Sequence, residues 1–253
     1  MKSATTYSDY DRFAWVYNKH WGPHFTPKAL DVIEKLVLPG IPSNARILDL
    51  CCGTGQLAQT LSERGYAVTG IDGSGEMLKF ARENAHDVQF ILDDARTFKL
   101  PKKYGAVVSV FDSLNHVMTI DELTSVFRNV HKCLKPGGLF LFDMNLEHGY
   151  ITNWKGHYGI VEDDHVCIFP NRYNPEERIG AIDFTIFRLE DNSWWRSYLT
   201  LTQKCYSQSE ILSALKSASF TDVHSYAHDQ RKGLRPLTEK ANRGFFLCQK
   251  TMA

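Results

Sequence analysis

A glycine-rich turn directly after a short apolar run is the feature that most constrains the fold of this chain. The run is ARILDL (45–50), and Cys51-Cys52-Gly53-Thr54-Gly55 connects it to the helical pattern QLAQTLSERG (56–65). Glycines let the backbone turn sharply and approach a ligand closely, and the N–H groups at the start of the next helix then face that ligand. The turn therefore predicts a strand, a ligand-binding loop and a helix in succession.

Strand and helix patterns continue to alternate along the chain. Further apolar β-type runs stand at 66–72, 88–94, 104–112 and 139–145. Apolar residues at helical spacing follow Ser74 and fill 119–134, where Lys135-Pro136-Gly137-Gly138 ends the pattern. The strands are nearly continuous apolar runs, as in parallel sheets that are buried on both faces. We expect an α/β fold with a Rossmann-like, doubly wound, mostly parallel sheet.

The pattern changes between residues 158 and 206. β-branched and aromatic residues dominate there, with turn signals at Asn174-Pro175 and Asp191-Asn192-Ser193. We expect a three-stranded antiparallel β insert that acts as a lid. A helix (207–218), a strand (221–227) and an antiparallel last strand (244–250) should follow. Residues 1–38 are expected to form an N-terminal helical cover, and the whole chain, 1–253, a single domain.

Composition narrows the classes of partner. Lys and Arg number 29, as do Asp and Glu, so the formal net charge is zero and a nucleic-acid partner is unlikely. No apolar run approaches the roughly 18 residues of a membrane helix, and the N-terminus shows no secretory signal. The six cysteines lack zinc or disulfide spacing. We expect a cytoplasmic protein without membrane partner or metal; the oligomeric state stays open.

Acidic residues end the first three predicted strands. Asp49 precedes the glycine turn, Asp72 ends the second strand, and Asp94 ends the third. Because GTGQLA also fits the dinucleotide template G-x-G-x-x-G/A, a nicotinamide oxidoreductase has to be weighed. A pyrophosphate does not explain an acid where anions would dock, whereas a ligand with a free amino group and a sulfonium does. Asp72 suits ribose hydroxyls, and Asp94, preferred over Asp93, suits an adenine amino group.

Five segments carry a resemblance to a known family. In order and spacing, ILDLCCGTGQLA, GIDGSGEML, FILDDARTF, VVSVFDSLNHV and LKPGGLFLFDMN resemble the successive signatures of class I S-adenosylmethionine-dependent methyltransferases. The resemblance covers most of residues 40–147. It implies S-adenosylmethionine as cofactor, S-adenosylhomocysteine as product, and an enzyme of the small-molecule N- or O-methyltransferase type.

The resemblance also implies a set of cofactor-binding residues. Asp49 and Gly53 would lie along the methionine part, Gly55 would leave room for the cofactor, and Cys51 stands where glycine is commonest. The full implied set is Tyr17, Asp49, Cys51, Gly53, Thr54, Gly55, Asp72, Gly73, Met77, Asp94, Ala95 and Phe111.

Catalysis would be in-line transfer of a methyl group, so the protein mainly supplies proximity, alignment and exclusion of water. A base is needed only where the acceptor has to lose a proton. His116, directly after the fourth strand, is the best candidate, because an imidazole exchanges protons near neutral pH. The alternative is that His116 caps the next helix or packs beneath the lid. Asn115 either binds the acceptor or shapes the loop.

The acceptor side is less determined. We expect Tyr10, Trp21, Arg172 and Tyr198 to bind the substrate, although aromatics usually pack in cores and Arg172 could be a solvated strand residue. The leading hypothesis is a methyltransferase that acts on nitrogen or oxygen of a small molecule. The alternatives are an RNA or protein methyltransferase with the same cofactor, and a catalytically silent cofactor-binding partner protein.

Overall fold

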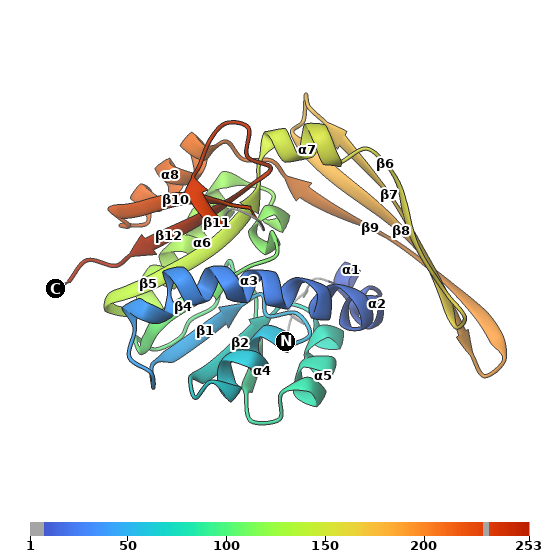
Figure 1. Cartoon of the computed structure of the whole chain (residues 1–253), viewed down its shortest axis with the longest axis horizontal. Coiled ribbons are helices and arrows are strands. Elements are labelled where there is room, and N and C mark those ends of the chain that lie inside the picture. The colour runs from blue at the N-terminus through green and yellow to red at the C-terminus, as the bar shows by residue number, and fades with distance from the viewer. Residues whose placement is uncertain (1–7, 230–232, 253) are drawn as a thin grey trace.

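The computed structural model describes residues 8–229 and 233–252, and its centre is an eight-stranded sheet of order β11-β10-β12-β5-β4-β1-β2-β3 (Figure 1). Five neighbouring strands pair in parallel, and they are β1 (Arg46–Leu50), β2 (Ala67–Asp72), β3 (Gln89–Leu92), β4 (Tyr104–Ser109) and β5 (Leu134–Asn145). This arrangement confirms the expected Rossmann-like, mostly parallel sheet. Each strand lies within two residues of its expected range except β4, which ends three residues earlier, and β5, which starts five residues earlier, at Leu134.

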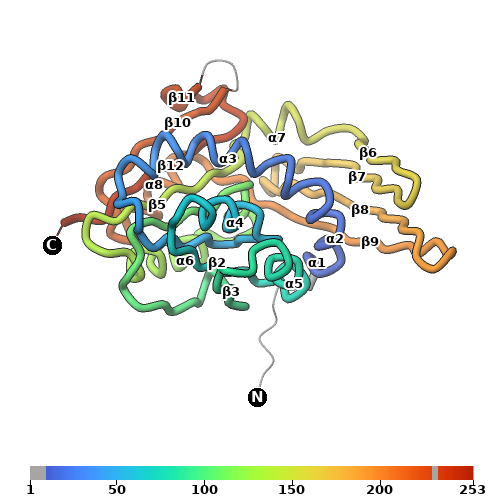
Figure 2. The backbone as a smooth tube through the Cα atoms, turned by 60° about the horizontal axis from the view of Figure 1, so that its bottom comes forward, coloured from blue at the N-terminus to red at the C-terminus, as the bar shows by residue number. Residues whose placement is uncertain are grey.

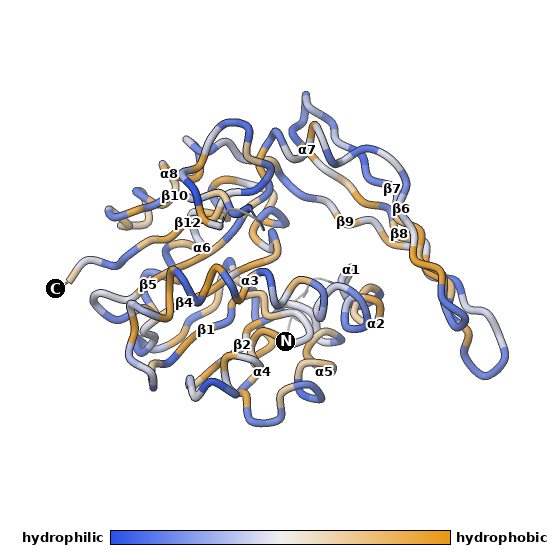
Figure 3. The backbone as a smooth tube through the Cα atoms, viewed as in Figure 1, coloured by the Kyte–Doolittle hydropathy of each residue, from blue (hydrophilic) through white to orange (hydrophobic). Residues whose placement is uncertain are grey.

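Apolar strands and amphipathic helices make the core because both faces of the sheet are covered. One face packs against α6 (Ile120–Cys133) and α8 (Gln208–Ser217), and the other packs against α3 (Gly22–Leu36) and α4 (Gln56–Glu63). Figure 3 shows the hydrophobic colouring concentrated along β1, β4 and β5, between these layers. The fifth helix, α5 (Gly75–Asn84), begins at Ser74, whose side chain accepts a hydrogen bond from the Met77 N–H.

The far end of the sheet is antiparallel. β12 (Arg243–Gln249) lies antiparallel between β5 and β10 (Asp222–Asp229), as expected for the last strand. A short edge strand that was not expected, β11 (Gly233–Pro236), pairs antiparallel with β10.

The insert is a separate antiparallel sheet of four strands, so the expectation of three was wrong. Its strands are β6 (Gly156–Glu162), β7 (His165–Asn174), β8 (Ile179–Glu190) and β9 (Ser193–Lys204), and α7 (Glu147–Asn153) leads into them. The first expected run splits into a hairpin because the chain turns at Asp163-Asp164, two acidic residues that were taken as part of one strand. Figures 1 and 2 both show this sheet extending beyond one side of the main sheet.

Helices before β1 connect the two sheets. They are α1 (Ser8–Asp11), α2 (Ala14–Val16), the wide π-type turn η1 (Tyr17–Trp21), α3, and the 3-10 turn η2 (Leu38–Gly40). The expected cover began at residue 1, and residues 1–7 lie outside the described residues. Phe13 and Trp21 pack against Phe184 of β8, with ring centroids 4.3 and 5.9 Å from that of Phe184. The helical segment therefore fills the angle between the main sheet and the insert. In residues 8–229 and 233–252, no helix has the length and hydropathy to span a membrane.

Candidate active site

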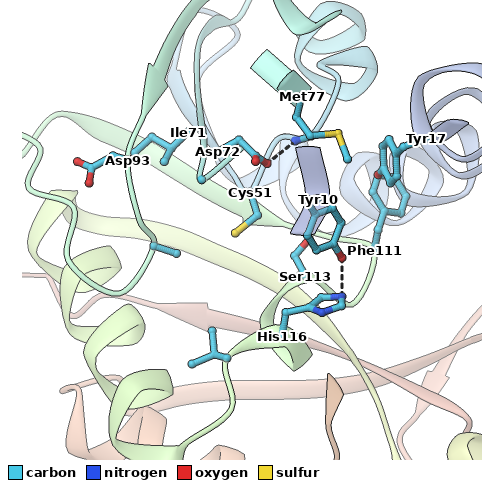
Figure 4. Close-up of a pocket in the computed structure, with 14 residues that line it drawn as sticks. Tyr10, Tyr17, Cys51, Ile71, Asp72, Met77, Asp93, Phe111, Ser113 and His116 are labelled. Atoms are coloured by element: carbon cyan, nitrogen blue, oxygen red, sulfur yellow. Dashed lines mark hydrogen bonds between the residues drawn. The ribbon is translucent and has the colours of Figure 1, made fainter. Parts of the chain in front are cut away.

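A cavity opens at the carboxyl ends of the parallel strands, beneath α1 and η1 (Figure 4). We call it the strand-end cavity. Its walls are Tyr10, Tyr17, Cys51, Gly53, Ile71, Asp72, Gly73, Met77, Asp93, Ala95, Phe111, Ser113, His116 and Val117. Eight of the twelve residues implied as cofactor-binding line it, and four do not: Asp49, Thr54, Gly55 and Asp94.

The turn between β1 and α4 is shaped by left-handed backbone. Cys51, Gly53 and Gly55 have φ angles of 61°, 54° and 82°. A Cβ on Gly55 would lie 3.0 Å from both Cα and Cβ of Ala81, so the missing side chain lets α5 approach rather than leaving room for a cofactor. Thr54 is fully buried, and its hydroxyl donates to Gln56 at 2.6 Å. Gly55 and Thr54 therefore build the turn from behind the cavity.

Cys51 holds a backbone conformation that favours glycine, and its side chain lines the strand-end cavity. Burial, with Asp72 and Asp49 nearby, raises the pKa of its thiol, so the sulfur stays protonated. Cys51 therefore provides a small apolar wall and not a nucleophile.

Asp72 joins two turns at the floor of the strand-end cavity. Its carboxylate accepts hydrogen bonds from the Gly53 N–H at 2.8 Å and the Ser74 N–H at 2.9 Å. Burial raises the pKa of Asp72 to about 6, although these hydrogen bonds act in the opposite direction. The carboxylate is thus fixed in place by backbone while it faces the cavity, which suits recognition of paired hydroxyl groups.

Asp49 lies in a narrow chamber behind Tyr17, next to the strand-end cavity. The residue is 2% exposed, and among the described residues its Oδ2 has no hydrogen-bond partner. Burial, and then the charge of Asp72, raise the pKa of Asp49 to about 7. A buried carboxylate without a partner is costly unless a cation pairs with it. The orphaned oxygen fits the amino group of a methionine-type ligand.

The two acids after β3 differ in their partners and in which of them lines the strand-end cavity. Arg96 holds both carboxylate oxygens of Asp94, at 3.0 and 2.6 Å, and Asp94 does not line the strand-end cavity. Partial burial raises the pKa of Asp94, but the hydrogen bonds from Arg96 outweigh it and the net shift is downward. Asp93 lines the cavity instead, at the edge far from His116 in Figure 4. The preference for Asp94 overlooked an arginine two residues away that neutralises it.

His116 meets Tyr10 at the other edge of the strand-end cavity (dashed line in Figure 4). The Tyr10 hydroxyl lies 2.6 Å from His116 Nε2, and His116 Nδ1 lies 2.8 Å from the Thr202 carbonyl oxygen. Because a carbonyl only accepts, Nδ1 carries the proton and Nε2 presents its lone pair. Burial lowers the pKa of His116 despite the opposing effect of Asp112, so the ring is neutral at pH 7.

A second cavity of about 300 Å³ lies between the main sheet and the insert. We call it the insert-side cavity. Tyr10, Tyr17, Phe111 and His116 line both cavities. The remaining walls are Phe13, Trp21, Phe25, Asp112, Asn145, Asn153, Trp154, Asn171, Ile182, Phe184, Leu201, Gln203 and Arg243. Two molecules, one in each cavity, would therefore meet at this four-residue wall.

Charged groups of the insert-side cavity were not found from the sequence. Arg243, at the start of β12, forms ion pairs with both Asp112 and Asp143. Phe111 and Asp112 both have left-handed backbone, with φ of 67° and 51°, which stores strain where both cavities meet. The only signal in the sequence was the position of Asp112 and Asp143 near the ends of two apolar runs, while Arg243 lies a hundred residues further on.

Three expected residues lie away from both cavities. Asn115 is fully buried; its Nδ2 donates to the carbonyls of Asn145 and Lys204, and its Oδ1 accepts from the Asn145 N–H. This geometry matches the loop-forming alternative. Arg172 forms an ion pair with Asp183, and the Tyr198 hydroxyl donates to Asp183 at 3.1 Å. Both belong to the solvent-facing side of the insert.

The comparisons with known proteins agree with this geometry. The family model described as a methyltransferase domain matches residues 47–138. The chain is 29% identical over 236 residues to the Bacillus subtilis methyltransferase-family protein YqeM, covering 88% of this chain and 94% of that protein. It is also 30% identical over 122 residues to a Streptomyces venezuelae dTDP-3-amino-3,4,6-trideoxy-alpha-D-glucopyranose N,N-dimethyltransferase, covering 48% of this chain and 51% of that enzyme.

The fold itself has a close counterpart among solved structures. An S-adenosylmethionine-dependent methyltransferase from Clostridium acetobutylicum superimposes with a TM-score of 0.78 at 20% identity, covering 96% of this chain and 99% of that one. The matched domain spans the strands and turns that form the strand-end cavity. Together with the orphaned Asp49 and the anchored Asp72, these likenesses place the chain among the class I S-adenosylmethionine-dependent methyltransferases.

Proposed function

We propose that this enzyme methylates an amino nitrogen of a small molecule that binds in the insert-side cavity. The observation that carries the proposal is the wall of Tyr10, Tyr17, Phe111 and His116, which belongs to both cavities. A cofactor in the strand-end cavity and an acceptor in the insert-side cavity would meet there. A volume of about 300 Å³ suits a small molecule rather than a folded macromolecule.

In this proposal the strand-end cavity holds the cofactor. Asp49 would pair with its amino group, Asp72 would accept from its ribose, and Asp93 with Ala95 would face its adenine. Bound S-adenosylmethionine supplies an already activated methyl group, so the protein has to align the partners and exclude water. The rings of Phe111, Tyr10 and Tyr17 would close the cavity around the methyl group during its transfer.

Charge favours an amine over a hydroxyl as acceptor. Among the described residues, Arg243 pairs with both Asp112 and Asp143, so two carboxyl groups share one guanidinium beside the insert-side cavity. Such a field attracts a protonated amine. His116, neutral and with its Nε2 lone pair in the wall, would take the proton that the nitrogen has to lose. The similar Streptomyces venezuelae enzyme is named for an amino sugar.

Calorimetric titration with S-adenosylhomocysteine, with NADH in parallel, tests the cofactor. We expect saturable binding of S-adenosylhomocysteine alone; binding of NADH alone would overturn the assignment. Methyl transfer from labelled S-adenosylmethionine to paired amino and hydroxy sugars then tests the acceptor class. Transfer to the amino member of each pair is expected, and transfer to hydroxyl members only would overturn the amine proposal.

His116→Gln tests the assignment of the base, because glutamine keeps polar contacts but takes no proton. Turnover should fall by about 10²-fold or more while affinity for S-adenosylhomocysteine stays unchanged. Arg172→Ala, on the solvent-facing side of the insert, is the matched control. Equal turnover in His116→Gln and the control would make His116 structural.

A further inference from the structure

Gln203, near the end of β9, is a buried side chain that the proposed reaction does not use. It is 3% exposed and lines the insert-side cavity. Its Oε1 accepts from the Tyr150 hydroxyl at 2.8 Å and from Asn145 Nδ2 at 3.1 Å. Its Nε2 donates to Asp112 Oδ2 and lies 3.1 Å from His116 Nε2. All four hydrogen-bonding positions of the amide are therefore engaged.

These partners fix which end of the amide faces His116. Asn145 Nδ2 is a donor, so it needs the Gln203 oxygen, and the Asp112 carboxylate accepts only, so it needs the Gln203 nitrogen. Turning the amide over would place two donors against each other at Asn145 and two acceptors against each other at Asp112. Gln203 therefore presents an N–H, and not an oxygen, to His116.

The same strand fixes the other side of the His116 ring. The Thr202 carbonyl, one residue before Gln203, holds the proton on Nδ1 at 2.8 Å. A second proton would sit on Nε2, directly opposite the Gln203 N–H. The remaining groups around the ring are Tyr10, whose hydroxyl can either donate or accept, and Asp112, which Arg243 pairs. Among these neighbours only Gln203 opposes the imidazolium by its geometry.

We propose that Gln203 is a positioning residue that keeps His116 neutral, with the proton on Nδ1 and with Nε2 unprotonated, in contact with Tyr10 and Gln203, until it takes a proton from the acceptor. The inference rests on the proposed function for the use of that lone pair. In the step it prepares, the acceptor N–H bond breaks, its electrons stay on nitrogen, and the proton forms an Nε2–H bond. The new Nε2–H then faces the Gln203 N–H, donor against donor, and this unfavourable contact favours release of the proton to solvent.

The substitution Gln203→Glu reverses the contact with His116 while keeping the shape, and it also sets a carboxylate against Asp112 Oδ2. A carboxylate oxygen would accept from Nε2–H, so the midpoint of His116 protonation should rise by about 1 pH unit or more. Gln203→Met removes the N–H without adding charge, and it should give a smaller rise. Unchanged affinity for S-adenosylhomocysteine would show that each variant keeps the fold of the strand-end cavity.

Imidazole nitrogen NMR, with the His116 signals identified by their loss in His116→Gln, reads the tautomer and the midpoint directly. In the wild-type protein we expect the Nδ1–H tautomer, neutral at pH 7, and in Gln203→Glu a larger imidazolium fraction at each pH across the titration. The acid limb of kcat against pH should move up with the NMR midpoint.

An Nε2–H tautomer in the wild-type protein, or equal midpoints in wild type and Gln203→Glu, would overturn the inference. If Gln203→Glu does not fold, the midpoint in Gln203→Met decides the matter, because the Thr202 carbonyl by itself already favours the wild-type tautomer; a midpoint equal to that of wild type would then overturn the inference. Neither spectrum needs an acceptor, so the role of Gln203 and the proposed amine methylation can be refuted independently. The expected tautomer without amine methylation would refute only the proposed function, and amine methylation with the other tautomer would refute only the role of Gln203.

Discussion

The two cavities are built in different ways. The strand-end cavity is made largely by turns that follow consecutive parallel strands, between Cys51 and Val117, with Tyr10 and Tyr17 from the preceding helices. The insert-side cavity collects side chains, one or two from each element, from α1, η1, α3, β5, α7, β7, β8, β9 and β12. A turn is specified by neighbouring residues, whereas a wall gathered from distant strands depends on register and on which side of each strand faces inward.

The two cavities also differ in how their charges are satisfied. In the strand-end region, Asp49 has an oxygen without a partner among the described residues. On the insert side, Asp112, Asp143, Arg243 and Gln203 hold one another. Substitutions near the strand-end cavity should therefore change ligand affinity, and those on the insert side should change geometry and acceptor use.

The largest effect is expected from Asp72→Ala. The change removes the anchor of the Gly53 and Ser74 N–H groups together with the carboxylate that faces the cavity. Hydrogen bonds to a charged group contribute about 1.5–3 kcal/mol each, so affinity for S-adenosylhomocysteine should fall by about 100-fold or more. Calorimetry measures this loss, and an affinity within threefold of wild type would contradict the role of Asp72.

Asp49→Asn should have a smaller effect that depends on pH. Since the pKa of Asp49 is about 7, the ligand-free carboxyl is protonated at pH 6 and ionised at pH 8. Pairing with a cationic amino group needs the ionised form, so wild-type affinity should be about tenfold weaker at pH 6 than at pH 8. The asparagine variant should bind weakly at both pH values. Equal pH dependence in the two proteins would remove Asp49 from the site.

The same substitution should stabilise the ligand-free protein. A carboxyl whose pKa is higher in the folded state than in the unfolded state costs stability as pH rises from about 4 through 7. Asp49→Asn removes that cost, so its unfolding free energy at pH 8 should exceed that of wild type by about 1–3 kcal/mol, with roughly a third of that difference at pH 5. Denaturant titration at both pH values measures this, and a less stable variant at pH 8 would show that Asp49 has a structural partner.

Features formed by neighbouring residues could be predicted from the sequence, whereas features formed by distant residues could not. The parallel strands, the glycine turn and the acids Asp49 and Asp72 were predictable because each signal lies within a few residues. The choice between Asp93 and Asp94 depends on where the Arg96 side chain reaches, which no local pattern in the sequence specifies. The fourth insert strand and the residues Arg243 and Gln203 were missed because strand pairing and inward orientation, rather than local pattern, bring them to the cavity.

A moderate effect confined to the acceptor should follow Trp21→Ala. Trp21 lines the insert-side cavity and not the strand-end cavity, and it makes edge-to-face contacts with Phe169 and Phe184 of the insert. Losing this ring should reduce kcat/KM for the acceptor by about tenfold, because an aromatic contact contributes about 0.5–1.5 kcal/mol beyond its buried area. Affinity for S-adenosylhomocysteine should stay within twofold. A loss of cofactor affinity equal to the loss of kcat/KM would mean that the two cavities are not separable.

The smallest effect is expected from Arg172→Ala. This substitution tests whether a residue on the outer face of the insert, away from the insert-side cavity, matters for the acceptor. Arg172 is 59% exposed in its side chain and pairs with Asp183 on the solvent-facing side of the sheet. Exposed ion pairs contribute about 0–1 kcal/mol, so stability should fall by no more than that, and kcat/KM should stay within twofold of wild type. A loss of tenfold or more in acceptor kcat/KM would mean that the acceptor extends over the outer face of the insert. The boundary of the insert-side cavity would then have to be redrawn around Arg172 and Tyr198.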